Sequence, residues 1–396
     1  MKKLLILIAL TFVSVALFAQ EEERRPTFEV YGEARTGVFQ YRTDDRRGLP
    51  ESTQRGAAFG NPVHPYYPFS GDGRFRLNMR YANARGNLGF NVRLTWQPLS
   101  ALEGPVWNWA YGWGRFFDDQ LTLSVGRLGT SPWGTGGPEM WRSLEIVQQP
   151  GFRFEWTPNF LPAGHSLNVG FVINYTDEVA DAGGDRDSTL LDILQESVIG
   201  AAYQNDWFLV RAAYRFDSVL DSPSARAGMD ADIQEGTQFV YRVEEFVLRN
   251  FVPYFRVWAL GSFWGIGSDI VEFERSYNWL FLEYAPPLFT AQLRLGIDVT
   301  EARRQASIRP WFILNLFDGM LQPSILFTYA NDFGDHQVVP GSNWSYIAVQ
   351  PEVRFNFTSN AHIAAAFYWS LTNELPFPNP PEVQRRTFNL RVGINF

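Results

Sequence analysis

Arginine is the residue type in this chain whose spacing could do chemistry. In the segment 74–81 every second residue is arginine or asparagine, and the residues between them are apolar. Successive side chains of a β-strand point to opposite faces, so the segment would gather its arginines on one face of a sheet. Charges that line a pore select ions by sign. The same pattern in other segments predicts a polar, pore-lining face that carries Arg74, Arg76, Arg80, Arg93, Arg153, Arg211, Arg215, Arg256, Arg294, Arg309, Arg354, Arg391, Glu155, Glu283 and Glu352.

Residues that could carry catalysis or hold a metal are not arranged for either. The chain has no cysteine, and its four histidines, His64, His165, His336 and His362, fall in separate segments. Neither a G-x-S-x-G nor an H-E-x-x-H run is present. The acidic segment 177–192 lacks the ordered spacing of a calcium loop, so a solvated loop explains it better. We therefore expect no catalytic residues, no metal site and no cofactor.

The first twenty residues have the composition of a secretory signal. Lys2 and Lys3 precede an apolar run, 4–18, and Ala19 is a candidate cleavage edge. Without the two lysines, 34 − 2 = 32 basic residues face 42 acidic ones, a net charge of −10 that argues against binding to nucleic acid. No later stretch has eighteen uncharged apolar residues, so we expect no membrane-spanning helix.

The last ten residues give the clearest strand pattern. One parity is wholly apolar and comprises Phe388, Leu390, Val392, Ile394 and Phe396, whereas the other is polar or small. The pattern resembles the closing strand of bacterial outer-membrane β-barrels, whose terminal aromatic and alternating apolar residues are the signal read by the barrel-assembly machinery. The resemblance implies export to the outer membrane, insertion by that machinery and contact with lipid. Porin-like barrels are often trimers, so a homotrimer is part of what it implies.

Alternation of this kind recurs along the chain. It predicts about eighteen strands, with sixteen as the alternative, near 28–42, 74–81, 88–96, 107–114, 121–125, 152–156, 167–175, 196–204, 207–216, 238–249, 251–264, 277–285, 288–299, 307–316, 320–330, 344–357, 361–371 and 385–396. Short joints alternate with long ones, which is typical of an up-and-down barrel in this membrane.

The predicted fold is therefore all-β, a transmembrane antiparallel barrel. It forms a single domain over residues 21–396 after a signal peptide at 1–20, with long external loops at about 43–73, 129–150, 177–195 and 217–237. The physical reason for closure is that lipid offers no partners to backbone N–H and C=O groups, so a sheet without edges is favoured. A barrel of this strand number is too wide to be filled by its own side chains, so its lumen should hold water.

The segment 129–150 lies between the fifth and sixth predicted strands. In general porins the loop at this place folds into the barrel and narrows it, and the run 125–129 with the following Trp-Gly and Trp-Arg pairs is similar to stretches in several porin families. The resemblance implies a constriction formed by Trp133, Glu139, Trp141, Arg142 and Glu145. An ordinary external loop is the alternative.

These observations predict a channel for passive diffusion of small hydrophilic solutes, with a mild preference for anions. Two other functions stay open, namely a surface-exposed barrel that acts in adhesion or structural support, and a selective transporter for one substrate. The anion preference also has an alternative, in which the arginines pair with neighbouring acids.

Overall fold

The computed structural model describes residues 25–46, 52–56, 74–96, 106–128, 133–134, 150–174, 197–216, 237–264, 275–300, 303–332, 345–373 and 382–396. The predicted signal peptide and the predicted loop 177–195 lie outside these ranges, as does 217–237 apart from Thr237. No helix within the described ranges is long and apolar enough to cross a membrane.

Antiparallel strands dominate the described chain. They are β1 (Thr27–Arg46), β2 (Ser52–Gly56), β3 (Arg74–Ala82), β4 (Leu88–Trp96), β5 (Val106–Phe116), β6 (Leu121–Arg127), β7 (Pro150–Trp156), β8 (Ser166–Asn174), β9 (Val198–Gln204), β10 (Phe208–Arg215), β11 (Gln238–Glu245), β12 (Phe255–Trp264), β13 (Arg275–Tyr284), β14 (Phe289–Thr300), β15 (Arg303–Leu314), β16 (Leu321–Asp332), β17 (Ser345–Thr358), β18 (Ala361–Asn373) and β19 (Glu382–Asn395). One short helix, α5 (Leu248–Phe251), connects β11 to β12. Each of the eighteen predicted segments overlaps one strand.

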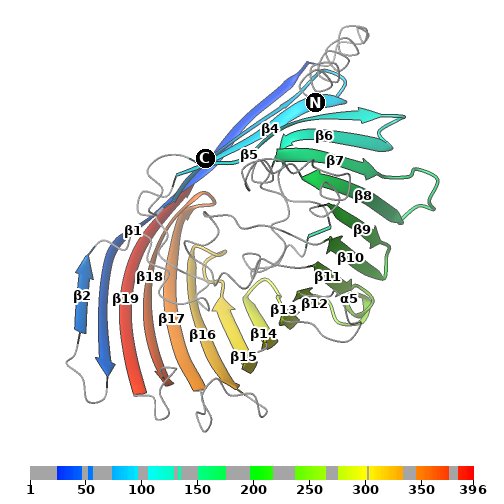
Figure 1. Cartoon of the computed structure of the whole chain (residues 1–396). Coiled ribbons are helices and arrows are strands. Elements are labelled where there is room, and N and C mark those ends of the chain that lie inside the picture. The colour runs from blue at the N-terminus through cyan, green and yellow to red at the C-terminus, as the bar shows by residue number, and fades with distance from the viewer. Residues whose placement is uncertain are drawn as a thin grey trace, which may run out of the picture.

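The strands close into a ring through β1. This strand pairs with β3 over 27–35 and with β19 over 33–46, and the other strands pair in chain order (Figure 1). The ring has eighteen strands, as predicted, so the alternative of sixteen is wrong. Strand β2 pairs only with residues 40–44 of β1 and extends the sheet beside it. Closure gives each ring strand a neighbour on both sides over part or all of its length, which matters because an unpaired backbone group in lipid costs several kcal/mol.

The last residue of the chain takes part in this closure. The amide of Phe396 donates to the carbonyl of Gly32 at 3.0 Å, and the amide of Gly32 donates back at 2.6 Å. A Cβ on Gly32 would lie 2.7 Å from the Phe396 ring, which stacks on Phe75 with centroids 5.9 Å apart. Phe388, Ile394 and Phe396 are exposed on the outer face of the barrel, and their role in assembly stays a prediction.

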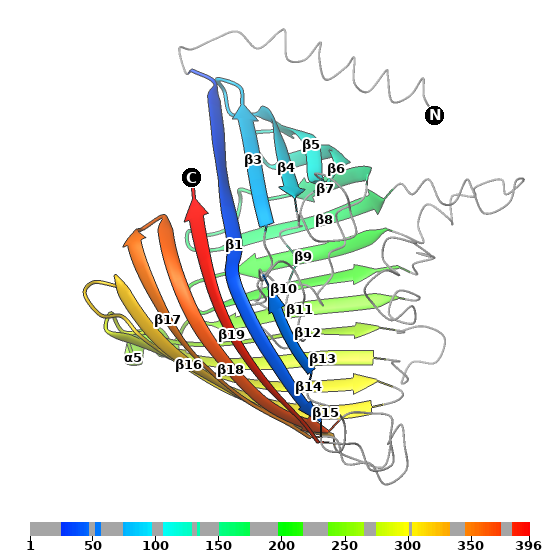
Figure 2. The same cartoon turned by 90° about the vertical axis from the view of Figure 1, so that its left-hand side faces the viewer.

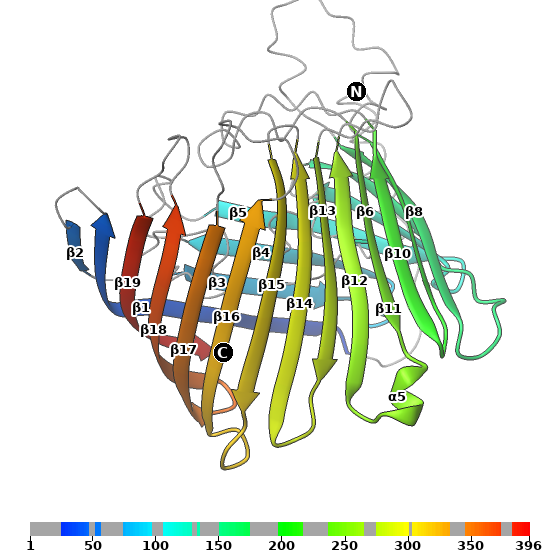
Figure 3. The same ribbon diagram turned by 90° about the horizontal axis from the view of Figure 1, so that it is seen from below.

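The two ends of the barrel differ in their connections. At one end, which we call the short-turn rim, tight connections such as 83–87, 117–120 and 205–207 join consecutive strands. The longest connections, such as those between β2 and β3, β6 and β7, and β8 and β9, lie at the opposite end, the long-loop rim. Figure 2 shows the strands running side by side between the two ends, and Figure 3 shows α5 at the short-turn rim.

Several predicted boundaries are wrong by up to four residues; the strand predicted from 251, for example, begins at Phe255, because residue 251 belongs to α5. The strand predicted to reach residue 249 ends at Glu245, because the Glu245 carboxylate accepts the amide of Leu248 at 2.7 Å and the chain turns into α5. The segment 43–73 was expected to be a loop, yet 43–46 complete β1 and 52–56 form β2. These errors concern strand ends and the short edge strand β2, where local hydrogen bonds and pairing with a neighbour outweigh the alternation of side chains.

The two faces of the ring divide the residues as alternation predicts. Large apolar side chains such as Phe28, Phe154, Ile297 and Phe327 are exposed on the outer face. On the inner face polar side chains such as Gln292 are buried, at 7% exposure or less. Transfer of one large apolar side chain from water to hydrocarbon contributes roughly 1.5–3 kcal/mol, so the outer face fits lipid and the inner face does not.

Candidate functional site: the inner wall of the barrel

The strand register places the predicted pore-lining positions together on the inner face. Directly paired residues of neighbouring strands share a face, and Arg211 lies opposite Arg242, Arg256 opposite Glu283, and Arg294 opposite Arg309. The side chain of Arg74 is not among those described. That these residues line a path for solutes stays a prediction.

Several of the predicted arginines pair with acids on the inner wall. Their nitrogen–oxygen distances are 3.2 Å for Arg76–Glu33, 3.8 Å for Arg80–Glu29, 2.5 Å for Arg153–Glu155, 3.7 Å for Arg354–Glu352 and 2.5 Å for Arg391–Glu352. Glu352 is 4% exposed, and its carboxylate forms ion pairs with both Arg354 and Arg391. Ion pairing thus explains part of the arginine pattern. This agrees with the alternative stated above, in which the arginines pair with neighbouring acids instead of attracting anions.

Other arginines of the inner wall lie against aromatic rings. The Arg309 guanidinium carbon is 4.4 Å from the centroid of Trp279, and that of Arg294 is 4.9 Å from the centroid of Trp311. The Arg294 Nε also donates a short hydrogen bond to Gln292. Such cation–π contacts contribute about 0.5–2 kcal/mol each and hold a guanidinium in one orientation.

Three aromatic residues of β5 point inward, which alternation does not reveal. Opposite Arg93 and Leu94 of β4, β5 carries one extra residue, so Trp109 pairs with Arg93 and position 107 with Leu94. Trp109, Tyr111 and Trp113 therefore share the face of the arginine. The Arg93 guanidinium carbon is 3.6 Å from the Trp109 centroid. The sequence pattern grouped all four aromatic positions on one apolar face. Only the pairing with β4 separates them, because neither parity of β5 carries a charge before Arg115.

Trp133 is the one residue of the predicted constriction that the structure describes, since Glu139, Trp141, Arg142 and Glu145 lie outside the described ranges. Its side chain is fully buried against the inner wall. Two glycines directly opposite each other, Gly170 on β8 and Gly200 on β9, make room for it. A Cβ on either would lie 2.2–2.3 Å from atoms of the indole.

Polar and apolar contacts hold this indole in place. Its Nε1 donates to Asn168 Oδ1 at 2.6 Å, and the Asn168 amide donates to Thr157 Oγ1 at 2.9 Å. Val172, Val198 and further apolar residues pack around the ring. We call Gly170, Gly200, Val172, Val198 and Asn168 the Trp133 seat.

A second cluster lies where β11 and β12 meet α5 at the short-turn rim. Glu244 is 4% exposed and binds three arginines, Arg242 at 2.8 Å, Arg249 at 2.5 Å and Arg256 at 2.9 Å. Arg256 also reaches Glu283 at 3.4 Å. We call Glu244 with its three arginines the Glu244 cluster. Of its members the sequence pattern singled out only Arg256. Arg249 lies in α5, where strand alternation does not apply, and Glu244 is followed directly by a second acid, Glu245.

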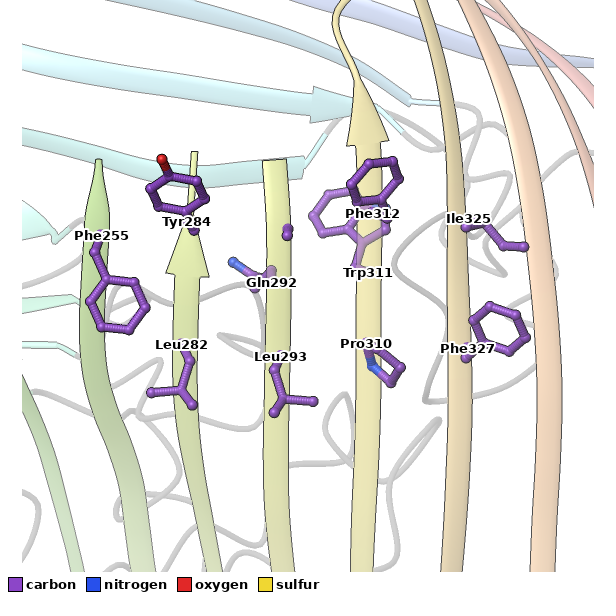
Figure 4. A pocket seen from close by; sticks show the side chains of 11 residues that line it. Phe255, Leu282, Tyr284, Gln292, Leu293, Pro310, Trp311, Phe312, Ile325 and Phe327 are labelled. Carbon is purple, nitrogen blue, oxygen red and sulfur yellow. The ribbon is translucent and has the colours of Figure 1, made fainter. Parts of the chain in front are cut away.

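The pocket in Figure 4 lies on the opposite, outer face of the barrel. It spans β12 to β16, has a volume of about 560 Å³ and is lined mainly by outward apolar residues such as Phe255, Leu282, Leu293 and Phe327. Its lining carries none of the charged residues discussed above. In the described part of the chain, moreover, no group of three His, Cys, Asp or Glu side chains could hold a metal ion.

Sequence signals for the missed residues exist but are weak. Gly170 and Gly200 each occupy the polar parity of a predicted strand, where a side chain would otherwise face the lumen. Paired glycines on that face indicate that another part of the chain approaches closely. For Asn168 and Glu244, one sequence offers no signal that separates them from other polar residues.

The fold is a closed, eighteen-stranded antiparallel β-barrel of porin-like architecture. Among solved structures, OpdQ of Pseudomonas aeruginosa is 12% identical, with a TM-score of 0.53 over 93% of this chain and 98% of that one. Outer-membrane expressed OmpT of Vibrio cholerae is 14% identical over 95% and 99%, with a TM-score of 0.46. An anion-selective porin from Comamonas acidovorans is 12% identical over 94% and 100%, with a TM-score of 0.44.

No model of a protein family matches the chain, and no curated protein matches it. At the identities of the structural matches, similarity concerns the fold alone.

Proposed function

We propose that this protein is an outer-membrane channel through which small hydrophilic solutes diffuse passively. The observation that carries the proposal is the division of a closed eighteen-stranded ring into an apolar outer face and a charged inner face. A ring of this strand number encloses more space than its own wall side chains fill. A lumen lined by arginine, glutamate and amide groups favours water and dissolved solutes.

The proposal includes a narrowed lumen. Burial of Trp133 in its seat on β8 and β9 supports inward folding of the segment 129–150 between β6 and β7. A segment fixed in this way would reduce the cross-section of the pore near the middle of the wall. Glu139, Trp141, Arg142 and Glu145 would then add their charge and bulk to the constriction.

A mild preference for anions is the second finer element of the proposal. Arg294 and Arg309 face each other directly across β14 and β15, and the Glu244 cluster has more arginines than acids. The ion pairs elsewhere on the wall neutralise part of this charge, so the preference should be small. Rings of charge select by sign in other pores, which is the physical basis for this element.

The remaining elements concern export and assembly. Residues 1–20 would direct export and be removed, the short-turn rim would face the periplasm, and the C-terminal strand would be read during insertion. Homotrimers are the arrangement we propose in the membrane. Passage rather than catalysis is proposed; of the two histidines in the described ranges, His165 contacts the Tyr203 hydroxyl and His362 lies against Gly393.

Planar-bilayer recording tests the channel. The mature chain, refolded in detergent and added to the bilayer, should give long-lived steps of constant conductance that scale with salt concentration. In a tenfold gradient of KCl the reversal potential should have the sign of anion preference. A protein that gives no conductance but whose loops bind a host ligand would instead support the adhesion alternative. A preference for cations would refute only the proposed anion preference.

A further inference from the structure

The Glu244 cluster holds its arginines differently from the ion pairs elsewhere on the wall. Three guanidinium groups from β11, α5 and β12 converge on one carboxylate. Arg211 faces Arg242 directly from β10, and Glu283 is the second acid bound to Arg256. Four arginines therefore share two inward acids. Glu245, on the other face of β11, accepts the amide of Leu248 and points away from the cluster.

Two of these arginines are accessible as well as positively charged. The side chains of Arg249 and Arg256 are 38% and 40% exposed, whereas that of Arg242 is 14% exposed. For Arg249, Glu244 is the sole acid partner within the described residues. Its other nitrogens leave hydrogen-bond donors that Glu244 cannot fill, because one carboxylate has too few lone pairs for three guanidinium groups.

Both exposed arginines are also fixed in orientation. The Arg249 guanidinium carbon is 4.7 Å from the ring centroid of Phe246, and that of Arg256 is 5.1 Å from the centroid of Trp258. Arg249 is thus held by one aromatic face and the shared Glu244 carboxylate, and Arg256 by one aromatic face and two carboxylates, those of Glu244 and Glu283. A pre-organised guanidinium loses little rotamer entropy on binding, and its planar edge matches the two oxygens of a carboxylate.

From this geometry we propose that Arg249 and Arg256 form a binding site for the carboxylate of a small organic anion at the short-turn mouth of the barrel. Glu244 positions the two arginines. Because its carboxylate is shared by three guanidinium groups, donors on Arg249 and Arg256 remain available to a solute. The partly exposed ring of Phe246 beside Arg249 suits a solute that carries carbon next to its carboxylate. The inference rests on the proposed channel and specifies one class of solute that it binds.

The test uses succinate as the probe on the full mature protein in a planar bilayer. Succinate should reduce the single-channel current in a saturable way, at lower concentration from the side of the short-turn rim. The variants Arg249→Gln and Arg256→Gln should each weaken this block about tenfold or more. Arg80→Gln is the matched control, because Arg80 lies at the same rim, is 55% exposed and pairs with one acid, Glu29. It should leave the block unchanged.

Three results would overturn the site. These are an absence of block in the unchanged protein, an equal block in Arg249→Gln, and an equal and non-saturable effect of inorganic phosphate, which would mean that charge alone acts. If the protein forms no pore at all, this result contradicts the proposed function and does not test the binding site. Calorimetric titration of the folded protein in detergent with succinate then decides the site independently, since binding lost in Arg249→Gln and kept in Arg80→Gln still supports it.

Discussion

The Trp133 seat and the Glu244 cluster hold side chains on the same inner wall by opposite means. At the seat, paired glycines and apolar residues enclose one indole, and its single polar atom is satisfied by Asn168. At the cluster, a buried carboxylate gathers three cations and leaves two of them partly exposed. The seat is closed to solvent, whereas the cluster is partly open and has guanidinium N–H donors that its acids do not fill.

This difference indicates that packing and charge control different properties of the wall. Complementary shape fixes one position to within a fraction of an ångström, because packed atoms have no room to move. Charge acts over a longer range and tolerates movement, so it can attract a passing solute. Changes at the seat should therefore alter stability and pore size, and changes at shared carboxylates should alter ion preference.

Removal of the indole should give the largest effect. Trp133→Ala leaves a cavity in the seat and should lower the free energy of unfolding by about 4 kcal/mol, while the single-channel conductance rises. Urea unfolding in lipid vesicles and bilayer recording measure the two. Trp207→Ala removes an indole that is 65% exposed in a turn and serves as the control. An unchanged conductance would count against the constriction.

A larger side chain at a glycine of the Trp133 seat should lower stability slightly less than Trp133→Ala. In Gly200→Val the new side chain meets the indole at its Cβ, 2.3 Å from the ring, so the two cannot coexist and stability should fall by about 3 kcal/mol. Conductance should rise as in Trp133→Ala. The matched control is Gly112→Val, since the nearest atom to a Cβ there lies at 3.7 Å.

Loss of a shared carboxylate should instead act on ion preference. Glu352→Gln leaves Arg354 and Arg391 without their negative partner, should cost about 2 kcal/mol of stability, and should shift the reversal potential in a KCl gradient toward anions. Glu29→Gln, at an exposed pair, should shift it less. A rise in conductance of the size seen for Trp133→Ala would contradict the division between shape and charge.

The smallest effect concerns the hydrogen bond between Trp133 and Asn168 in the seat. Asn168→Ala removes the acceptor of the Trp133 N–H and should cost about 1 kcal/mol. In a Trp133→Phe background the same substitution should cost less, because phenylalanine has no N–H to satisfy. The double-mutant cycle therefore isolates this bond, and equal costs in both backgrounds would show that Asn168 acts only through its other partners, Thr157 and Glu155.

The amino-acid sequence by itself determined the sheet and its two faces. Alternation with a period of two is local, so Phe388, Leu390 and Val392 or the arginines of 74–81 reveal their face without knowledge of any other strand. Eighteen such segments with alternating joints sufficed for the barrel, because lipid accepts few other arrangements of strands.

Contacts between segments distant in the sequence were decided only by the tertiary structure. The inward turn of Trp109 depends on a register shift against β4, and the Trp133 seat depends on glycines that lie opposite each other on β8 and β9. The convergence of Arg242, Arg249 and Arg256 on Glu244 likewise needs two strands and a turn in their final places. Such contacts follow from pairing geometry, which residue type and spacing along one strand do not contain.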